Sequence, residues 1–323
     1  MRERFTAVVM RSTGSWYEVR NTEAATDDEQ IQKARVRGRL RLSGSRSTNP
    51  VVVGDRVQCS AEESGEVWIE EVLPRDNYII RRSSNLSRES HIVAANIDRA
   101  VVVATLFSPV TAPEFIDRFL VTCEAYRIPA TVILNKIDLA LATDGGDEAV
   151  RRFVEIYEQA GYGVMLTSAV TGRGVDELRD HLRGRTTLVS GNSGVGKSTL
   201  IGAVSPGLDI RVGEISRAHG KGMHTTTFSQ MYPLGGAAPK SREEGYIIDT
   251  PGIKGFGLVD IEGGELYHYF PDLMRVAPEC QYYNCTHTHE PGCAVTRAVE
   301  SGQIAEERYT SYLKMLEEDN KYR

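Results

Sequence analysis

Three short sequence motifs occur in this chain in a rotated order. NKID at Asn135 to Asp138 comes first, GNSGVGKST at Gly191 to Thr199 follows, and DTPG at Asp249 to Gly252 comes last. Proteins that carry all three motifs ordinarily begin with the glycine-rich one. The order therefore predicts a circularly permuted α/β fold, in which the pocket is kept and the segment after DTPG continues into the C-terminal region.

The composition is typical of a soluble protein with more than one domain. The chain has 323 residues, of which 41% are hydrophobic and 25% charged, and this leaves room for two or three domains. No stretch approaches the roughly 20 apolar residues of a membrane-spanning helix, and the first residues lack a signal peptide. We expect a cytoplasmic monomer with no membrane partner. The net charge of −6 implies that any RNA-binding surface is local.

Short β-rich runs separated by Gly, Ser, Asn and Asp turns fill the chain up to about residue 80, which is typical of a small β-barrel. Five cations there alternate with small or apolar residues and so share one strand face, here called the basic stripe: Lys33, Arg35, Arg37, Arg39 and Arg41. Arg46 extends the stripe, and no acidic residue occurs from Ile31 to Gly54. A nucleic-acid backbone is the expected partner. A solvated strand face is the alternative.

The middle of the chain alternates between strand-like and helix-like runs. AVVVATL, ATVILNKID, GYGVMLTSA, TTLVSG and GYIIDTPG follow a polar segment, Arg81 to Ser90, that we interpret as a linker. Such alternation predicts a parallel, doubly wound sheet with its ligand at the carboxyl ends of the strands. We expect a barrel at residues 1–80, this α/β core at 81–264, and a small C-terminal domain at 265–323 that ends in a helix.

GNSGVGKS matches the phosphate-loop pattern and lies between a strand-like and a helix-like run. Its glycines let backbone N–H groups point at phosphate oxygens, Lys197 neutralises the β- and γ-phosphates, and Ser198 offers a hydroxyl to Mg²⁺. The predicted phosphate-binding residues are Gly191, Asn192, Ser193, Gly194, Val195, Gly196, Lys197, Ser198 and Thr199. A glycine-rich surface turn is the alternative.

NKID indicates which base is bound. Asp138 can accept hydrogen bonds from N1–H and the N2 amino group of guanine, a donor pair that adenine lacks. Asn135 and Lys136 would support the loop and the ring. Ser168 and Ala169, in the TSA that follows the next strand, would present backbone groups to guanine O6. GTP and GDP are therefore the expected ligands, with Mg²⁺.

DTPG and the preceding GKGMHTTTF loop carry the expected γ-phosphate response. Asp249 would hold Mg²⁺ through water, and the Gly252 N–H would contact the γ-phosphate. A plain β-turn is the alternative for DTPG. One threonine of the loop, either Thr226 or its neighbours Thr225 and Thr227, would bind Mg²⁺ directly.

Hydrolysis needs a group that orients the attacking water, and the usual position lacks one. Ile253 follows DTPG where many GTPases carry glutamine, and isoleucine cannot hydrogen-bond water. His224 is the nearest competent candidate, although a structural histidine is the alternative. The predicted catalytic residues are His224, Lys197 and Thr226.

Cysteine and histidine cluster near the C-terminus as C-x4-C-x-H-x5-C. Cys280, Cys285, His287 and Cys293 form a Cys₃His set suited to one tetrahedral, structural Zn²⁺. His289 is the alternative nitrogen ligand, and free structural thiols are the alternative to a metal. Cys59 and Cys123 stand alone in apolar surroundings and should be core residues.

With these motifs in this order, the whole chain resembles the family of ribosome small-subunit-dependent GTPases called RsgA. The resemblance implies an OB-fold, a permuted GTPase core and a zinc domain. It also implies a late assembly factor that binds the small (30S) subunit and its rRNA with GTP bound and leaves after subunit-stimulated hydrolysis. His224 would then assist hydrolysis, although the sequence GKGM before HTTT departs from the basic residue expected there.

Two other functions remain open from the sequence. One is an RNA-binding scaffold that holds nucleotide with little turnover, which Ile253 favours. The other is a permuted GTPase that serves the large ribosomal subunit.

Overall fold

The chain forms two compact units, each described here by itself. The computed structural model describes residues 3–13, 16–23, 31–38, 50–82, 90–206, 208, 229–234, 245–249 and 263–321. The first unit takes its described residues from Met1–Ala100, Asp176–Ser190 and Ser198–Val259, and the second from Val101–Val175, Gly191–Lys197 and Asp260–Arg323. Among the helices in these ranges, none has the length and apolar character needed to span a bilayer.

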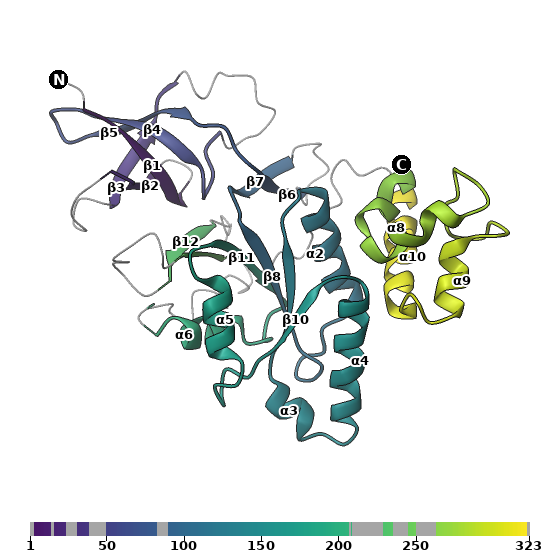
Figure 1. Ribbon diagram of the computed structural model, residues 1–323. Helices are drawn as coiled ribbons and strands as arrows, with labels where there is room; N and C mark the ends of the chain where they lie inside the picture. The colour runs from purple at the N-terminus through teal and green to yellow at the C-terminus, as the bar shows by residue number, and fades with distance from the viewer. Residues whose placement is uncertain are drawn as a thin grey trace. The chain divides into compact units, whose positions relative to one another are not determined.

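Five strands at the start of the chain close into a barrel (Figure 1). They are β1 (Glu3–Ser12), β2 (Tyr17–Asn21), β3 (Ile31–Val36), β4 (Arg56–Ala61) and β5 (Val67–Val72). β1 pairs with β2 and β4, β2 with β3, β3 with β5, and β5 with β4, which closes the ring. Alternate residues point inward, and Ala7, Val19 and Ile69 are fully buried there. The predicted small barrel is confirmed.

The basic stripe is confirmed over part of its length. Lys33 and Arg35 on β3 are exposed, while Ala34 and Val36 between them are buried, as the two-residue period requires. Arg37 follows the end of β3 and is half-buried in ion pairs with acidic residues from elsewhere in the barrel. Arg39, Arg41 and Arg46 lie outside the described residues.

A two-stranded hairpin leads out of the barrel. β6 (Tyr78–Arg82) pairs antiparallel with β7 (Ser90–Ala95). The expectation of a linker from Arg81 to Ser90 is therefore wrong at both ends of that segment. The error has a physical reason, because strand pairing uses backbone groups and polar side chains do not reveal it.

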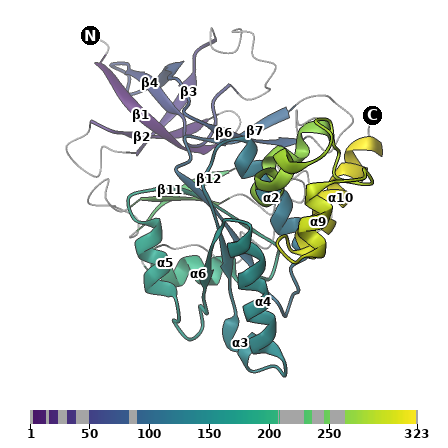
Figure 2. The same ribbon diagram turned by 45° about the vertical axis from the view of Figure 1, so that its right-hand side comes forward.

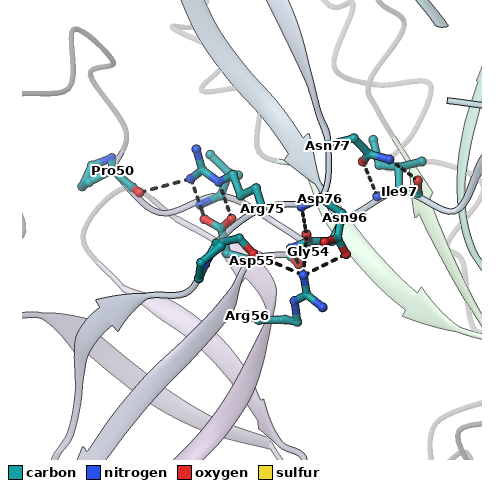
Figure 3. Close-up of polar contacts among 11 residues, drawn as sticks. Pro50, Gly54, Asp55, Arg56, Arg75, Asp76, Asn77, Asn96 and Ile97 are labelled. Atoms are coloured by element: carbon teal, nitrogen blue, oxygen red, sulfur yellow. Dashed lines mark hydrogen bonds and ion pairs between the residues drawn. The ribbon is translucent and has the colours of Figure 1, made fainter. Parts of the chain in front are cut away.

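A polar network joins the barrel to this hairpin (Figure 3). We call it the barrel junction and define it as Gly54, Asp55, Arg56, Arg75, Asp76 and Asn96. The Asn96 side chain donates to the carbonyl of Gly54 at 2.9 Å and accepts from the N–H of Asp76 at 2.9 Å. Asp55 is buried and receives two hydrogen bonds from the Arg75 guanidinium, at 2.6 and 2.8 Å. The junction thus contains both backbone and charged partners.

The core sheet of the first unit is continuous with the barrel. β11 (Thr186–Gly191) lies parallel to β13 (Tyr246–Asp249), and β13 pairs antiparallel with β12 (Gln230–Pro233). β12 in turn pairs with β1, where Arg11 lies opposite Gln230. Arg20 on β2 also donates to the hydroxyl of Tyr246. The helices α5 (Val175–Leu182) and α6 (Lys197–Val204) flank β11 in sequence.

The second unit contains the other half of the predicted α/β pattern. Its strands follow the order β10 (Gly163–Leu166), β9 (Ala130–Leu134), β8 (Arg99–Ala104), with β9 and β10 parallel. Its helices are α2 (Pro113–Ala125), α3 (Ile137–Leu141) and α4 (Gly146–Gln159). The buried face of α2 includes Cys123, which was predicted to be a core residue, as was the buried Cys59 of the barrel.

Short helices form the C-terminal part of the second unit. They are the 3-10 helix Gly263–Tyr269, α8 (Pro271–Val276), the 3-10 turn Ala277–Glu279, α9 (Ala294–Glu300) and α10 (Glu306–Lys321). In both views α10 lies beside α2 (Figures 1 and 2). Arg308 on α10 is fully buried and bonds to Asp117 on α2 at 2.6 Å and to Asp272 on α8 at 3.0 Å. We call these three residues the Arg308 cluster.

Candidate nucleotide site and metal centre

The loops that carry NKID and TSA lie side by side at the carboxyl ends of their strands. The N–H of Asn135 donates to the carbonyl of Ala104, the last residue of β8, at 2.9 Å. The N–H of Thr167 donates to the carbonyl of Leu134, the last residue of β9, at 2.8 Å. Each loop is thus held by a backbone hydrogen bond to the last residue of the neighbouring strand. This is the edge at which parallel α/β sheets bind ligands.

Asn135 joins three motifs that are far apart in the sequence. Its side chain is buried, and its Nδ2 donates to the carbonyl of Val195 in the phosphate loop at 2.9 Å. Its Oδ1 accepts a hydrogen bond from the Thr167 hydroxyl at 3.1 Å. A buried amide whose donor and acceptor are both used fixes its neighbours in one arrangement. NKID, TSA and the phosphate loop therefore belong to one site.

Lys136 makes a second bridge to the phosphate loop. Its backbone is left-handed, with φ of 59°, and its Nζ donates to the carbonyl of Gly194 at 2.7 Å and to that of Ser108 at 2.6 Å. The ammonium thus ties the loop after β8 to the phosphate loop. The methylene stem of the lysine connects these carbonyls to the predicted base site.

The close approach of these loops explains why position 196 is glycine. Its φ is +89°, a conformation that other residues adopt only with strain. A Cβ added there would lie 2.6 Å from Nδ2 of Asn135. Any side chain would therefore separate the phosphate loop from NKID.

Lys197 lies inside the phosphate loop at the start of α6. Its side chain is 7% exposed, and its Nζ donates to the carbonyls of Gly191 at 2.6 Å and Asn192 at 3.0 Å. The loop thus surrounds a cation and precedes a helix N-terminus, an arrangement that favours anions. Ser198 and Thr199 follow in the first turn of α6, half-exposed and exposed respectively.

The base-recognition residues divide into two groups. Asp138 lies half-buried in the first turn of α3, one residue beyond Ile137. Ser168 is fully buried, and its N–H donates to the carbonyl of Arg173 at 2.9 Å. The tight TSA loop thus uses the Ser168 N–H internally, and the contact of Ser168 with guanine stays a prediction. Within the described chain, the N–H of Ala169 makes no such bond.

Several predicted residues cannot be placed. His224, Thr225, Thr226, Thr227, Gly252 and Ile253 lie outside the described residues. Asp249 ends β13, and its side chain is also outside them. The γ-phosphate and catalytic assignments therefore stay predictions.

Two residues of the site had no predicted role. The Thr167 hydroxyl orients Asn135. The only sequence signal for this role was that Thr167 is the first residue of TSA. The Ser108 carbonyl accepts from Lys136, and no sequence signal could have shown this because any residue supplies a carbonyl. Both act on the NKID loop.

The predicted metal ligands converge in the C-terminal part. Ligand atoms of Cys280, Cys285, His287 and Cys293 all lie within 4.8 Å of one another. Nδ1 of His287 is 3.5 Å from Sγ of Cys280 and 3.6 Å from Sγ of Cys293. Tetrahedral Zn²⁺, with bonds of about 2.3 Å to sulfur and 2.0 Å to nitrogen, requires an N to S separation of about 3.5 Å. The donor set and its spacing fit zinc.

The surroundings of the cluster fix its ligands. The alternative ligand His289 is exposed, and its Nδ1 lies 2.8 Å from the Thr288 hydroxyl instead. The hydroxyls of Tyr309 and Tyr312, both on α10, donate to the carbonyls of His287 and Thr286 at 2.8 and 2.7 Å. The last helix therefore holds the ligand loop in place.

The thiols differ in acidity. Burial raises the pKa of Cys285 to about 12. Burial also disfavours the thiolate of Cys293, but hydrogen bonds from the backbone and hydroxyl of Thr296 hold its pKa below the usual value. A bound cation would favour the thiolate at each cysteine, because metal ligands are deprotonated.

Comparison with known sequences gives the same organisation. Residues 72–259 match the family model of the RsgA GTPase, and residues 7–69 match that of the RsgA N-terminal domain. A small ribosomal subunit biogenesis GTPase RsgA of Bacteroides fragilis is 52% identical over 319 residues, which are 98% of each chain. The protein of the same name from Porphyromonas gingivalis is 49% identical over 97% of this chain and 96% of its own.

Solved structures agree with the sequence relatives. YjeQ from Thermotoga maritima has a TM-score of 0.77 and 33% identity, with 98% of this chain and 99% of that chain covered. YloQ, described as a circularly permuted GTPase, has a TM-score of 0.73 and 26% identity, with 99% and 96% covered. The rotated motif order of this chain agrees with that description of YloQ.

Proposed function

Because this chain belongs to the RsgA GTPase family, we propose that it hydrolyses GTP in the site described above and acts in maturation of the small ribosomal subunit. One observation carries the proposal. Asn135 and Lys136 bond directly to carbonyls of the phosphate loop, although 60 and 58 residues separate the bonded pairs. These contacts support a single ligand that the base-binding and phosphate-binding motifs both face.

The chain would recognise guanine through one carboxylate and one N–H. Asp138 accepts from N1–H and the N2 amino group, and the Ala169 N–H donates to O6. Asn135 positions both loops without touching the base. This pairing rejects adenine, which would leave the Asp138 carboxylate without donors.

The phosphate loop, from Gly191 to Thr199, would bind the triphosphate. Its N–H groups and Lys197 stabilise negative charge on the β- and γ-phosphates as the bond to the leaving group breaks. Mg²⁺, held by Ser198, by Thr226 and through water by Asp249, would neutralise further charge on the same oxygens. The Gly252 N–H donates to the γ-phosphate.

Water activation is assigned to His224. Isoleucine at 253 offers no hydrogen bond, so His224 orients the attacking water in the proposed mechanism. A variant His224→Ala would then bind GTP normally but hydrolyse it slowly.

The flanking domains would serve recognition and stability. The barrel (residues 1–80) contacts rRNA, the core (81–264) binds GTP, and the C-terminal domain (265–323) holds one Zn²⁺ in a closed site that takes no part in the chemistry. The protein acts as a cytoplasmic monomer whose partner is the small subunit.

The proposal is tested by steady-state hydrolysis of GTP with and without purified small subunits. We expect slow turnover alone, faster turnover with subunits, and loss of both on Lys197→Ala. Large subunits serve as the control, and preferential stimulation by them would support a large-subunit GTPase instead. Equal turnover under all conditions would contradict the mechanism, and bound GTP that persists in a single-turnover assay with small subunits would indicate a scaffold.

A further inference from the structure

Two tryptophans lie on the outer side of the barrel, each beneath an arginine. The Arg35 guanidinium carbon lies 3.9 Å from the ring centre of Trp16, and that of Arg37 lies 5.6 Å from the ring centre of Trp68. The first distance is that of face-to-face stacking. Trp16 remains 40% exposed although the arginine covers part of its ring.

The two arginines differ in how their charge is balanced. Arg37 bonds to Glu62 at 2.9 Å and to Glu70 at 3.0 Å. Arg35 has no carboxylate within ion-pair distance in the part of the chain that the structure describes, and Lys33 on the same face has none there either. Glu18, which lies across from Lys33, pairs instead with Arg11 at 3.8 Å. Within the described residues, the positive charge of Arg35 and Lys33 is therefore available to a partner.

The stacked pair occupies the face that OB barrels use. Trp16 directly precedes β2, and its carbonyl accepts hydrogen bonds from the N–H and hydroxyl of Thr13, both at 2.9 Å, which close the β1–β2 connection. Arg35 projects from β3, the neighbour of β2. Nucleic acids bind OB-folds across strands 2 and 3 and the loop between strands 1 and 2.

This combination fits an unpaired nucleotide better than a duplex. A planar guanidinium stacked on indole offers its other face to a base, while its edge can donate to a phosphate. Duplex RNA hides its base faces and would use only the charges.

We propose that Trp16 and Arg35 form a stacking site for one unpaired RNA base, with Lys33 on an adjacent phosphate and Arg37 excluded. The inference rests on the proposed contact between the barrel and rRNA and names its chemistry. It also divides the basic stripe into residues that bind RNA and a residue that supports the barrel.

The test measures binding of the full-length protein to a fluorescein-labelled single-stranded oligoadenylate of about 12 nucleotides, with an RNA duplex of equal length in parallel. Trp16→Ala should weaken single-strand binding by about tenfold or more, and Trp16→Phe should retain most of it. Arg35→Gln should also weaken binding and reduce the slope of log K against log salt by about 0.7, the value for one phosphate contact.

Arg37→Gln is the matched control, because it removes the same charge from a paired position. It should leave both the affinity and the salt slope close to those of the wild type, with the urea midpoint of tryptophan fluorescence reporting that the barrel is folded. Equal loss of affinity from Arg35→Gln and Arg37→Gln would overturn the proposal. So would unchanged single-strand binding by Trp16→Ala, or an equal loss for the duplex.

Failure of the inference and of the proposed function can be told apart. If small subunits stimulate the wild type and Trp16→Ala equally, with equal affinity, the stacking site is wrong and the proposed function stands. If Trp16→Ala loses subunit binding but keeps oligoadenylate binding, the surface contacts something other than an unpaired base. If subunits stimulate neither protein, the proposed function itself fails.

Discussion

The barrel and the C-terminal helices are fastened to the core by different kinds of interaction. The barrel joins through strand pairing between β1 and β12 and through the barrel junction, which combines partly exposed polar groups with the ion pair of Arg75 and the buried Asp55. The C-terminal helices join α2 through Arg308, whose guanidinium is fully buried with two carboxylates. The barrel attachment is spread over backbone pairing and several polar groups, and the C-terminal attachment is concentrated in a few residues.

This difference predicts different sensitivity to substitution. A single hydrogen bond contributes about 0.5–1.5 kcal/mol, so the loss of one from a distributed network is tolerated. Removing one member of a buried charge cluster leaves the others unpaired in a low-dielectric interior, at a cost of about 3–5 kcal/mol. The C-terminal attachment should therefore be more fragile than that of the barrel.

Separate probes exist for the two regions. Both tryptophans of the chain, Trp16 and Trp68, lie in the barrel, so tryptophan fluorescence reports barrel unfolding. The Cys₃His cluster lies in the C-terminal part, so release of the proposed zinc to a chromogenic chelator would report unfolding of this part. Urea titration followed by both probes measures each attachment in the same sample.

The largest effect should come from loss of the metal. Cys293→Ser removes one of four ligands, and structural zinc in small domains contributes on the order of 10 kcal/mol to folding. Purified Cys293→Ser protein should hold little zinc by elemental analysis, and its C-terminal helices should exchange amide hydrogens rapidly. The fluorescence transition of the barrel should be unchanged. His289→Ala is the control, and loss of zinc from it would contradict the ligand assignment.

Arg308→Ala should lower the stability of the C-terminal attachment by about 3–5 kcal/mol, because Asp117 and Asp272 stay buried without their cation. Zinc release should begin at a clearly lower urea concentration, while tryptophan fluorescence should change little. Arg152→Ala breaks a partly exposed ion pair with Glu307, which lies on α10 next to Arg308. The loss in the free energy of unfolding should be less than about 1 kcal/mol. Equal shifts for the two variants would refute the concentrated attachment.

The Arg308 cluster should also make this attachment sensitive to pH. One guanidinium faces two carboxylates, and burial raises the pKa of Asp117 to about 6, against the opposing charge of Arg308. The folded form then binds a proton more tightly than the unfolded chain does. The contribution of Asp117 to the free energy of unfolding is fully present below about pH 4. It is lost as the pH rises through 6, and the loss is at most about 3 kcal/mol.

Asp117→Asn isolates this contribution. The difference in zinc-release midpoint between variant and wild type should change between pH 5 and pH 7.5, in favour of the variant at the higher pH. A difference that is constant across this range would show that Asp117 stays ionised in the folded protein.

The smallest effect is expected in the barrel junction. Arg56→Ala removes hydrogen bonds to Asp76 at 2.8 Å, to the carbonyl of Pro74 at 3.2 Å and to Asn96 at 3.3 Å. These groups are partly exposed and can bond to water, so the loss should be about 1 kcal/mol or less. If Arg56→Ala shifted the urea midpoint of tryptophan fluorescence as far as Arg308→Ala shifts that of zinc release, the barrel attachment would also be concentrated in a few residues.

Features with a local signal could be predicted from the sequence. The alternation of Ala34 and Val36 with Lys33 and Arg35 predicted which side of β3 is exposed. The position of NKID and the phosphate loop at strand ends predicted that the two lie close together. The convergence of Cys280, Cys285, His287 and Cys293 followed from their spacing alone. Each of these depends on residues close together in the chain or on a rule that relates strand ends.

Features that depend on distant partners could not be predicted. Arg37 resembles Arg35 in sequence, and only the fold brings Glu62 and Glu70 to it. Arg308 sits in a charged run typical of an exposed helix, yet it is fully buried. The internal bond of the Ser168 N–H depends on how tightly its loop turns. His224, Thr226 and Gly252 stay predictions.

The central claim is that motifs in rotated order form one site that selects guanine by its hydrogen-bond donors. Competition between GTP and xanthosine triphosphate for Asp138→Asn protein tests it most directly. The account predicts that the variant loses preference for GTP and gains preference for xanthosine triphosphate, a combined shift of about 10²-fold or more, with Lys197 still required. An unchanged preference for GTP in a folded Asp138→Asn variant would contradict the account.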